Sequence, residues 1–303
     1  MMNRAASTFA EGVDLSMYII TGISLFFLIG ITIVMIYFVF RYNKKRNAKA
    51  SNISHNNTLE IIWTAVPTIL VLVMFYYGWM GYKPMRNTPK HAMEINVYGQ
   101  MWQFSYEYPG GKTSDTLVVP VNLPVKLNLV SRDVLHSFYV PAFRIKEDLV
   151  PGKNNYVWFE PTMEGEFQVL CAEYCGLLHS KMLSIVKVVS VGEYADWVAK
   201  NIVTEEHAGL VLMKKHACLS CHTQDGTRLV GPSFKGIYGK TEKVVTNGQV
   251  REVVIDDAYI KNSIYQPNAD VVETYTQGLM ISYEKLITPE EVNEIIDYMK
   301  SIK

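Results

Sequence analysis

The most informative segment of the chain is Cys171-Ala-Glu-Tyr-Cys175-Gly-Leu-Leu-His179-Ser-Lys-Met182, and a second imidazole, His136, lies 35 residues upstream of it. Thiolates and a thioether combined with imidazole select copper, whereas carboxylate sites select magnesium or calcium. One copper ion would need a single thiolate. Two cysteines on one loop therefore predict two copper ions that share both sulfurs, with one histidine for each and Met182 as a weak additional ligand.

Other interpretations of these residues remain open from the sequence. Cys171 and Cys175 could form a disulfide in an oxidising compartment. Zinc could bind the thiols and imidazoles, although methionine is an unusual zinc ligand. Taken alone, His136 would more often be a buried, hydrogen-bonded histidine, and Met182 a core side chain.

The segment lies within a region, residues 91–190, that has the pattern of a β domain. Apolar side chains largely alternate with polar ones at Ile95, Val97, Trp102, Phe104, Tyr106 and Tyr108. Short β-branched or aromatic runs return at 118–130, 156–159, 167–170 and 185–189, separated by glycines and prolines. This pattern predicts an all-β, antiparallel sandwich or barrel.

Residues 1–90 carry two long uncharged stretches, 15–40 and 61–82. At 1.5 Å per residue, each is longer than the roughly 30 Å hydrocarbon core of a bilayer. A segment in lipid satisfies its backbone polar groups as a helix, so we expect a two-helix transmembrane hairpin. The composition agrees, because only 19% of the 303 residues are charged, against roughly 25% in soluble domains. A signal peptide is the alternative for the first stretch, but its apolar core is usually shorter, about 7–15 residues.

The loop between these stretches is basic. It carries Arg41, Lys44, Lys45, Arg46 and Lys49 with no acidic residue before Glu60. By the positive-inside rule the loop is cytoplasmic, so both ends of the chain and the β domain are expected on the outer side.

A second motif, Cys218-Leu-Ser-Cys221-His222, is the signature for covalent haem attachment. In it, two thiols form thioethers with the porphyrin and the adjacent histidine binds iron. Two cysteines at this spacing alone would also suit a thioredoxin-like or zinc site. The adjoining His222 and the expected location outside the cytoplasm favour haem c.

The sixth iron ligand must come from elsewhere in the same domain. Met280 lies on a predicted loop and is the preferred candidate, since methionine and histidine ligation suits electron transfer. Met299 belongs to an apolar helix stripe, Met213 to a helix leading into the motif, and His216 is a further alternative.

The C-terminal helix is the clearest element of this domain. Thr288, Pro289 and Glu291 form the pattern of a capping box, and an apolar stripe follows it. We expect residues 205–303 to form an all-α cytochrome c domain, joined to the β domain by an amphipathic linker over residues 191–204.

The ligand set resembles the dinuclear copper centre of cytochrome c oxidase subunit II, here with a fused C-terminal cytochrome c domain. The resemblance covers about residues 15–190 and implies a cupredoxin-like fold for the β domain. It also implies that the Glu173 carbonyl binds one copper, while the Glu173 side chain binds a magnesium ion shared with the catalytic subunit. By the same resemblance, Trp102 lies near the face where the electron donor docks. Glu60 resembles the acid at the mouth of a proton channel, although it could equally be an interfacial anchor.

This resemblance implies the electron-entry subunit of a proton-translocating cytochrome c oxidase in the bacterial inner membrane. Its partners would be the catalytic haem–copper subunit I, other oxidase subunits, membrane lipid, and a cytochrome c or membrane-bound cytochrome donor. Oxygen reduction would take place in another subunit. Nucleic acid is not expected as a partner, because 29 basic and 29 acidic residues cancel.

Three other functions have parts of this pattern. A quinol oxidase subunit shares the anchor and sandwich but has no use for the metal ligands. A nitric oxide reductase subunit would use similar modules toward another acceptor. A membrane-tethered copper carrier would leave the haem motif unexplained.

Overall fold

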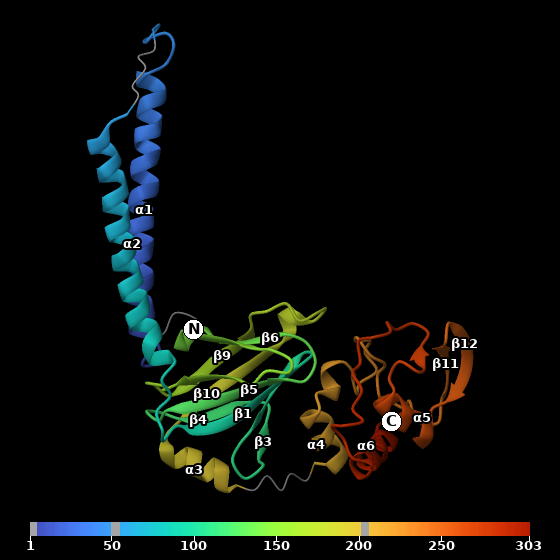
Figure 1. Cartoon of the computed structure of the whole chain (residues 1–303). Coiled ribbons are helices and arrows are strands. Elements are labelled where there is room, and N and C mark those ends of the chain that lie inside the picture. The colour runs from blue at the N-terminus through green and yellow to red at the C-terminus, as the bar shows by residue number, and fades with distance from the viewer. Residues whose placement is uncertain (1–4, 50–54, 201–205) are drawn as a thin grey trace.

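The computed structural model describes residues 5–49, 55–200 and 206–303. Two antiparallel helices, α1 (Ala10–Arg41) and α2 (Asn57–Met85), stand clear of the remaining chain (Figure 1). Both are long and apolar enough to cross a membrane, and they contain the predicted stretches 15–40 and 61–82. The prediction of two long apolar helices is confirmed, and the helices extend beyond the uncharged residues at both ends.

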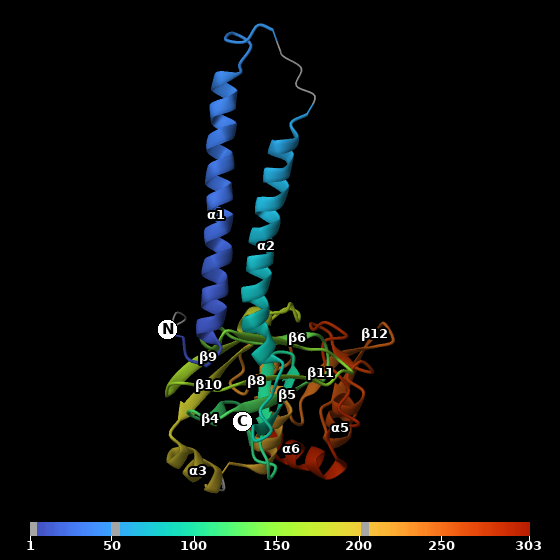
Figure 2. The same ribbon diagram turned by 60° about the vertical axis from the view of Figure 1, so that its left-hand side comes forward.

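The two helices approach each other through small residues next to the β domain (Figure 2). The Ser16 hydroxyl donates to the Tyr77 carbonyl at 3.2 Å. A Cβ atom on Gly81 would lie 3.6 Å from the Gly12 carbonyl oxygen. Small side chains let helix backbones come close in lipid, where packing rather than the hydrophobic effect drives association.

Two five-stranded sheets follow and face each other as a sandwich. The first has the order β3-β2-β1-β5-β8 and the second β4-β10-β9-β6-β7. The strands of the first sheet are β1 (Met93–Gln100), β2 (Gln103–Glu107), β3 (Thr113–Ser114), β5 (Val125–Ser131) and β8 (Asn155–Phe159). Those of the second are β4 (Leu117–Pro120), β6 (His136–Val140), β7 (Ile145–Leu149), β9 (Gly165–Cys171) and β10 (Leu183–Val189).

The predicted alternation places Ile95, Val97, Phe104 and Tyr106 in the shared core, each at most 1% exposed. The expectation of antiparallel pairing holds for most pairs, but β1 pairs with β5 and β4 with β10 in parallel. The chain passes to the opposite sheet between these strands, so they are not joined by hairpins, which antiparallel neighbours usually are.

The segment predicted as a linker begins with helix α3 (Val191–Ala199), which is packed on the sandwich. Its Ser190–Glu193 capping box fixes the start of the helix. The Trp197 ring lies 4.8 Å from that of Tyr108. The rest of the predicted linker, apart from Lys200, lies outside the described residues.

The C-terminal domain contains α4 (Ala208–Lys215), α5 (Asp257–Tyr265) and α6 (Pro289–Ser301). Helix α6 has the predicted capping box, with the Glu291 amide donating to the Thr288 hydroxyl at 3.3 Å. Helices α4 and α6 touch at Gly209, where a Cβ atom would lie 2.1 Å from the Glu294 carbonyl oxygen.

The expectation of an all-α domain is wrong in one region. Strands β11 (Thr241–Thr246), β12 (Gln249–Val254) and β13 (Val271–Val272) form an antiparallel sheet in the order β12-β11-β13. Asn247 and Gly248 join β11 to β12 with φ angles of 49° and 81°. Two positive φ values between β-branched strands are the mark of a tight hairpin turn.

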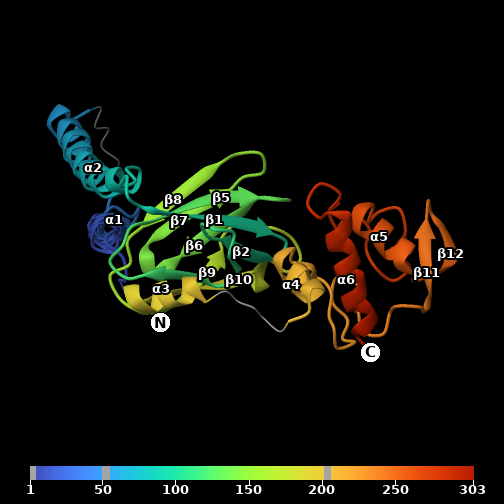
Figure 3. The ribbon, with the colours of Figure 1, turned by 90° about the horizontal axis from the view of Figure 1, so that it is seen from below.

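The C-terminal domain docks on one end of the sandwich through α4 and the short helix η3 (Cys218–Ser220) (Figure 3). Gln103 accepts a hydrogen bond from the Ser220 hydroxyl at 3.2 Å and donates to the Lys214 carbonyl at 3.4 Å. The Gln100 amide donates to the Tyr283 hydroxyl. Cys221 and Val230 pack against the apolar core of the sandwich.

Candidate functional site

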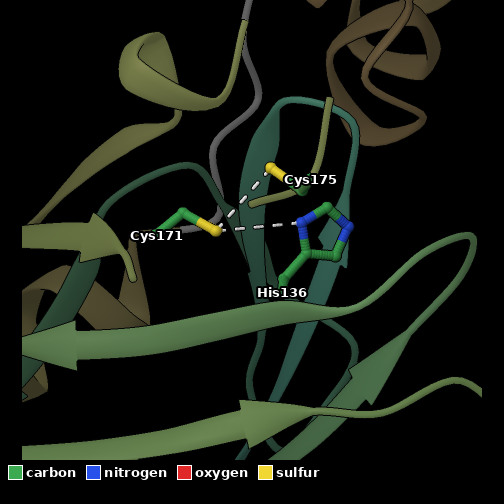
Figure 4. A group of neighbouring side chains, drawn as sticks. All are labelled: His136, Cys171 and Cys175. Atoms are coloured by element: carbon green, nitrogen blue, oxygen red, sulfur yellow. Dashed lines mark hydrogen bonds between the residues drawn. The ribbon is translucent and has the colours of Figure 1, made fainter. Parts of the chain in front are cut away.

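Three of the predicted copper ligands, His136, Cys171 and Cys175, lie together at the end of the sandwich (Figure 4). His136 is the first residue of β6, Cys171 is the last residue of β9, and Cys175 lies on the loop that leads to β10. The two sulfurs are 3.7 Å apart, and Cys171 Sγ is 4.0 Å from His136 Nδ1. A disulfide needs an S–S distance of about 2.05 Å. Both thiols are free, so the disulfide interpretation is wrong.

The remaining predicted ligands surround the same two sulfurs. Cys175 Sγ lies 3.5 Å from His179 Nδ1 and 3.7 Å from Met182 Sδ. The Glu173 carbonyl oxygen lies 3.2 Å from Cys171 Sγ. Each sulfur therefore has its own imidazole, and the thioether and carbonyl stand beside different sulfurs. This donor set fits two soft metal ions better than a single zinc ion.

The site is mostly shielded from water, and its environment favours deprotonation of one of the two thiols. His136 and Met182 are fully buried, and Cys171 and Cys175 are 9% and 3% exposed. Burial alone would raise the pKa of the Cys171 thiol, but hydrogen bonds from His136 and the Ser137 backbone outweigh it and lower this pKa. Burial and the neighbouring Cys171 raise the pKa of Cys175. The pair thus gives up its first proton easily, and a bound cation would favour loss of the second.

Sequence reasoning assigned no role to Asp133, which holds His136 in place. One carboxylate oxygen, Oδ1, lies 2.7 Å from His136 Nε2, and the other, Oδ2, accepts from the Met101 amide at 2.7 Å. The bond to Nε2 favours the tautomer in which Nδ1 is available to a metal. The spacing Asp133-Val-Leu-His136 was the available signal, because it brings an acid next to a candidate ligand.

Trp102 lies beside the copper ligands. It is 5% exposed, and its indole N–H donates to the Cys175 carbonyl at 3.1 Å. The structure thus places this side chain in direct contact with the loop that carries Cys175.

The haem-motif residues border a cavity of the C-terminal domain whose wall also includes residues of the sandwich. Cys218, Cys221, His222 and Met280 all line it. His222 Nδ1 lies 2.7 Å from the Pro232 carbonyl oxygen, which leaves Nε2 as the nitrogen that can bind iron. The paired thiols, the oriented imidazole and the thioether at one cavity fit a covalently attached haem.

The alternatives for the sixth ligand differ in position. Met213 and Met299 also border the cavity, but from α4 and α6, where they are 0% and 5% exposed. His216 is 3% exposed, and neither ring nitrogen has a hydrogen-bond partner among the described residues. Burial and the nearby Lys215 and Arg132 lower the pKa of His216 to about 4. His216 is not among the described residues that border the cavity, whereas Met280 reaches it from a loop.

Glu60 lies far from both sites, in the first turn of α2. With Asn57, Thr64 and Thr68 it lines a shallow surface hollow at that end of the helix. Asn56 caps this helix by accepting from the Leu59 amide at 3.1 Å. The structure thus places Glu60 at the end of α2 that adjoins the basic loop.

Comparison with known proteins identifies the first two parts of the chain. Residues 1–78 match the model for the cytochrome c oxidase subunit II transmembrane domain, and residues 112–189 match that for its periplasmic domain. The alternative cytochrome c oxidase subunit 2 of Bradyrhizobium diazoefficiens is 34% identical over 60% of this chain and 76% of its own length. The cytochrome c oxidase subunit 2 of Alkalihalophilus pseudofirmus is 29% identical over 91% of this chain and 83% of its own length.

A solved structure also matches part of the chain. The periplasmic domain of subunit II of cytochrome oxidase from Bradyrhizobium japonicum is 33% identical and covers 37% of this chain and 94% of its own, with a TM-score of 0.35. The two apolar helices and the β-sandwich agree with the two family-model matches. The chain belongs to the cytochrome c oxidase subunit II family and is a subunit of an oxidoreductase complex.

Proposed function

We propose that this chain receives electrons on a covalently bound haem c and passes them through a dinuclear copper centre to the catalytic subunit that reduces oxygen. Membership of the subunit II family supports the role of an electron-entry subunit. The observation that carries the finer proposal is the donor set around Cys171 and Cys175, in which each of two sulfurs 3.7 Å apart faces its own imidazole.

The copper-binding residues have distinct tasks in this proposal. Cys171, Cys175, His136 and His179 would hold the copper ions, and Met182 and the Glu173 carbonyl would complete the site. The bound pair supplies a one-electron centre whose charge is shared over two metals. The surrounding sandwich excludes water and fixes the ligands, so little rearrangement accompanies electron transfer. We assign a magnesium ion at the subunit interface to the Glu173 carboxylate.

The haem-binding residues would act at the cavity of the C-terminal domain. Cys218 and Cys221 would hold the porphyrin covalently, and His222 and Met280 would bind its iron. The bound group supplies a second one-electron centre, and the apolar cavity keeps water from it.

The membrane part places these centres on the outer side of the inner membrane in this proposal. The basic loop after α1 stays cytoplasmic, both chain ends lie on the outer side, and α1 and α2 contact lipid and the catalytic subunit I. Electrons come from a cytochrome c or a membrane-bound cytochrome. Glu60 serves proton entry into the catalytic subunit, which translocates protons.

Metal analysis and spectroscopy of the purified oxidase complex test the copper assignment. We expect two copper atoms per chain in this subunit and a mixed-valence EPR signal in which both copper nuclei share the electron. Cys171→Ser should abolish that signal, whereas Cys218→Ser should leave it intact. A single-copper spectrum, or zinc in place of copper, would overturn the assignment.

Replacing the sixth ligand tests the haem assignment. Met280→Leu should leave the haem covalently attached but remove low-spin methionine ligation and lower its reduction potential, because thioether ligation raises that potential. Met299→Leu is the matched control, since this side chain is buried in α6. Optical spectra of both variants check the result. An unchanged Met280→Leu spectrum would move the ligand elsewhere, and a chain without covalent haem would refute the haem proposal.

A further inference from the structure

We propose that Asp133 couples the two redox centres of this chain, because it orients the His136 imidazole and joins it to the wall of the haem cavity. This inference rests on the proposed haem and copper sites and adds a positioning residue to them. Neither the ligand motif nor the haem motif contains Asp133. Its place in the fold, on the loop between β5 and β6, brings it between the two sites.

On the copper side, the contact is direct. The Asp133 side chain is 2% exposed and the His136 side chain 0%, and Oδ1 lies 2.7 Å from Nε2. A buried carboxylate beside the outer nitrogen of a metal-binding histidine fixes the ring and strengthens it as a ligand. His136 Nδ1 in turn lies 4.0 Å from Cys171 Sγ, so the carboxylate is one side chain away from the bridging sulfurs.

On the haem side, Asp133 lines the same cavity as Cys218, Cys221 and His222. Only two other described residues of the sandwich reach this cavity, Gln100 and Met101. The Met101 amide donates to Asp133 Oδ2 at 2.7 Å. The sandwich wall of the cavity is therefore tied to the copper ligand through the two oxygens of one carboxylate.

Trp102 occupies a different position. Its indole contacts the Cys175 carbonyl, and it is not among the described residues that border the cavity. For an electron that arrives on the fused haem, one described route from the cavity wall to a copper ligand runs from the Met101 amide through Asp133 to His136. Another follows the chain from Met101 to Trp102 and its hydrogen bond to the Cys175 carbonyl. In this step Asp133 and His136 would convey one electron from a ferrous haem to the oxidised copper pair, which leaves ferric haem and a pair reduced by one electron.

The hydrogen bonds of the Asp133 carboxylate indicate which substitution tests its role. Asp133 Oδ1 faces His136 Nε2 and also accepts from the Val134 amide at 2.6 Å, while Oδ2 accepts from the Met101 amide. Asparagine has almost the same shape but a single acceptor oxygen. Asp133→Asn therefore keeps the bonds of only one of the two oxygens without leaving a cavity, while Asp133→Ala loses all three. Asp115→Asn is the matched control, because this exposed carboxylate of the same domain contacts only the neighbouring Thr116 through its side chain among the bonds described.

The experiment uses the intact oxidase complex, in which a photoexcited ruthenium compound injects one electron into the haem. Reoxidation of the haem and reduction of the copper are then followed optically. Loss of a hydrogen-bond partner of a metal-binding residue typically lowers metal affinity or activity about 10–100-fold. We therefore expect Asp133→Asn to slow electron transfer from the haem to the copper pair about tenfold, and Asp133→Ala to slow it still more. The nitrogen couplings of His136 in the copper EPR spectrum should change in parallel, whereas Asp115→Asn should alter neither.

Rates are expressed per chain that retains both centres, counted by EPR and haem absorbance. If both centres are present and Asp133→Asn leaves the rate and the nitrogen couplings unchanged, the inference is wrong while the proposed function stands. If the unmodified complex lacks the copper pair or the haem, the proposed function itself fails.

Discussion

Gly99 and Gly231 leave room for one histidine of each proposed redox site. Gly99 belongs to β1, and a Cβ atom there would lie 3.2 Å from His136 Cδ2 and 2.8 Å from Leu149 Cδ2. At Gly231 the added atom would lie 2.5 Å from His222 Cε1. The His136 and His222 rings both lie in close-packed surroundings, which have no room for an extra methyl group.

Gly99→Ala should disturb the copper site and spare the haem. The new methyl group presses on His136 and Leu149, and overpacking of this kind costs about 1–3 kcal/mol. We expect lower copper occupancy or an altered copper EPR spectrum, with an unchanged haem spectrum. Gly192→Ala is the control, because nothing lies within 4 Å of its added Cβ. A normal copper spectrum in Gly99→Ala would show that His136 does not bind the metal in this position.

Gly231→Ala should disturb the haem site and spare the copper site. Its methyl group would displace the His222 ring, which is held between the Pro232 carbonyl and the Phe234 ring, stacked at a centroid distance of 4.5 Å. Low-spin haem should be lost or much reduced, while copper content stays normal. Optical spectra and metal analysis on one preparation measure both effects. Equal damage to the two centres would point to general misfolding instead.

Among single elements, those that a local sequence pattern specifies could be predicted, and those that depend on contacts between distant residues could not. The membrane helices, the alternating strands and the α6 capping box are local patterns, and the structure contains all of them. The parallel pairing of β1 with β5 was not predictable, because it depends on where the chain changes sheets. The β11–β12 hairpin was missed although Asn247-Gly248 between β-branched runs is a strong local signal.

The candidate site shows the same contrast between residues that a local pattern identifies and residues whose role depends on a long-range contact. Five of the six proposed copper ligands were named from residue types and spacing, and the sixth, the Glu173 carbonyl, from the family resemblance. The structure brings all six together around two sulfurs. Asp133 was overlooked because a carboxylate is not a copper ligand, and its role depends on a contact with His136 Nε2 that spacing alone does not show. The burial of Trp102 likewise depends on how the loop from 171 to 182 folds over it.

Helix α6 allows a prediction about pH. The Thr288 amide donates to the Glu291 carboxylate at 3.0 Å, and Lys215 lies 3.3 Å from it. The Thr288 backbone N–H, followed by Lys215, lowers the pKa of Glu291 below its usual 4.5 despite partial burial. A carboxylate with a lowered folded pKa adds stability above its unfolded pKa, and this is lost as pH falls through the folded value.

Glu291→Gln should therefore destabilise α6 at neutral pH and make little difference in strong acid. Hydrogen exchange of the α6 amides in the full-length chain measures this over a series of pH values. Glu290→Gln is the control, since it is also in the first turn but has no part in the capping box. An effect of Glu291→Gln that is the same at every pH would exclude the charge as its source.

At the scale of the whole molecule, the fused domain lies against the end of the sandwich that holds the copper ligands. Its apolar contacts there include Cys221 and Val230, which touch the sandwich core. No periodic pattern in the sequence marks Gln100, Gln103 or Tyr283 as interface residues, so this docking could not be predicted. Tethering would make the meeting of the two proposed redox centres intramolecular, and its frequency would then be set by the linker rather than by diffusion.

The chemistry of this interface predicts how electron transfer across it responds to salt. The described hydrogen bonds between the domains join amides, hydroxyls and a backbone carbonyl, all of them neutral groups. Salt screens interactions between exposed charges over a Debye length of about 10 Å at 0.1 M, and it has little effect on neutral contacts. The rate between haem and copper within the chain should therefore stay nearly constant as ionic strength rises. Reduction of the haem by a separate, charged donor protein should depend on salt, because its encounter is steered by charge.

Flash-induced reduction at several salt concentrations separates the two steps. A steep fall of the internal rate with salt would mean that charged groups hold the domains together, and that the docked arrangement is only one of those the tether permits.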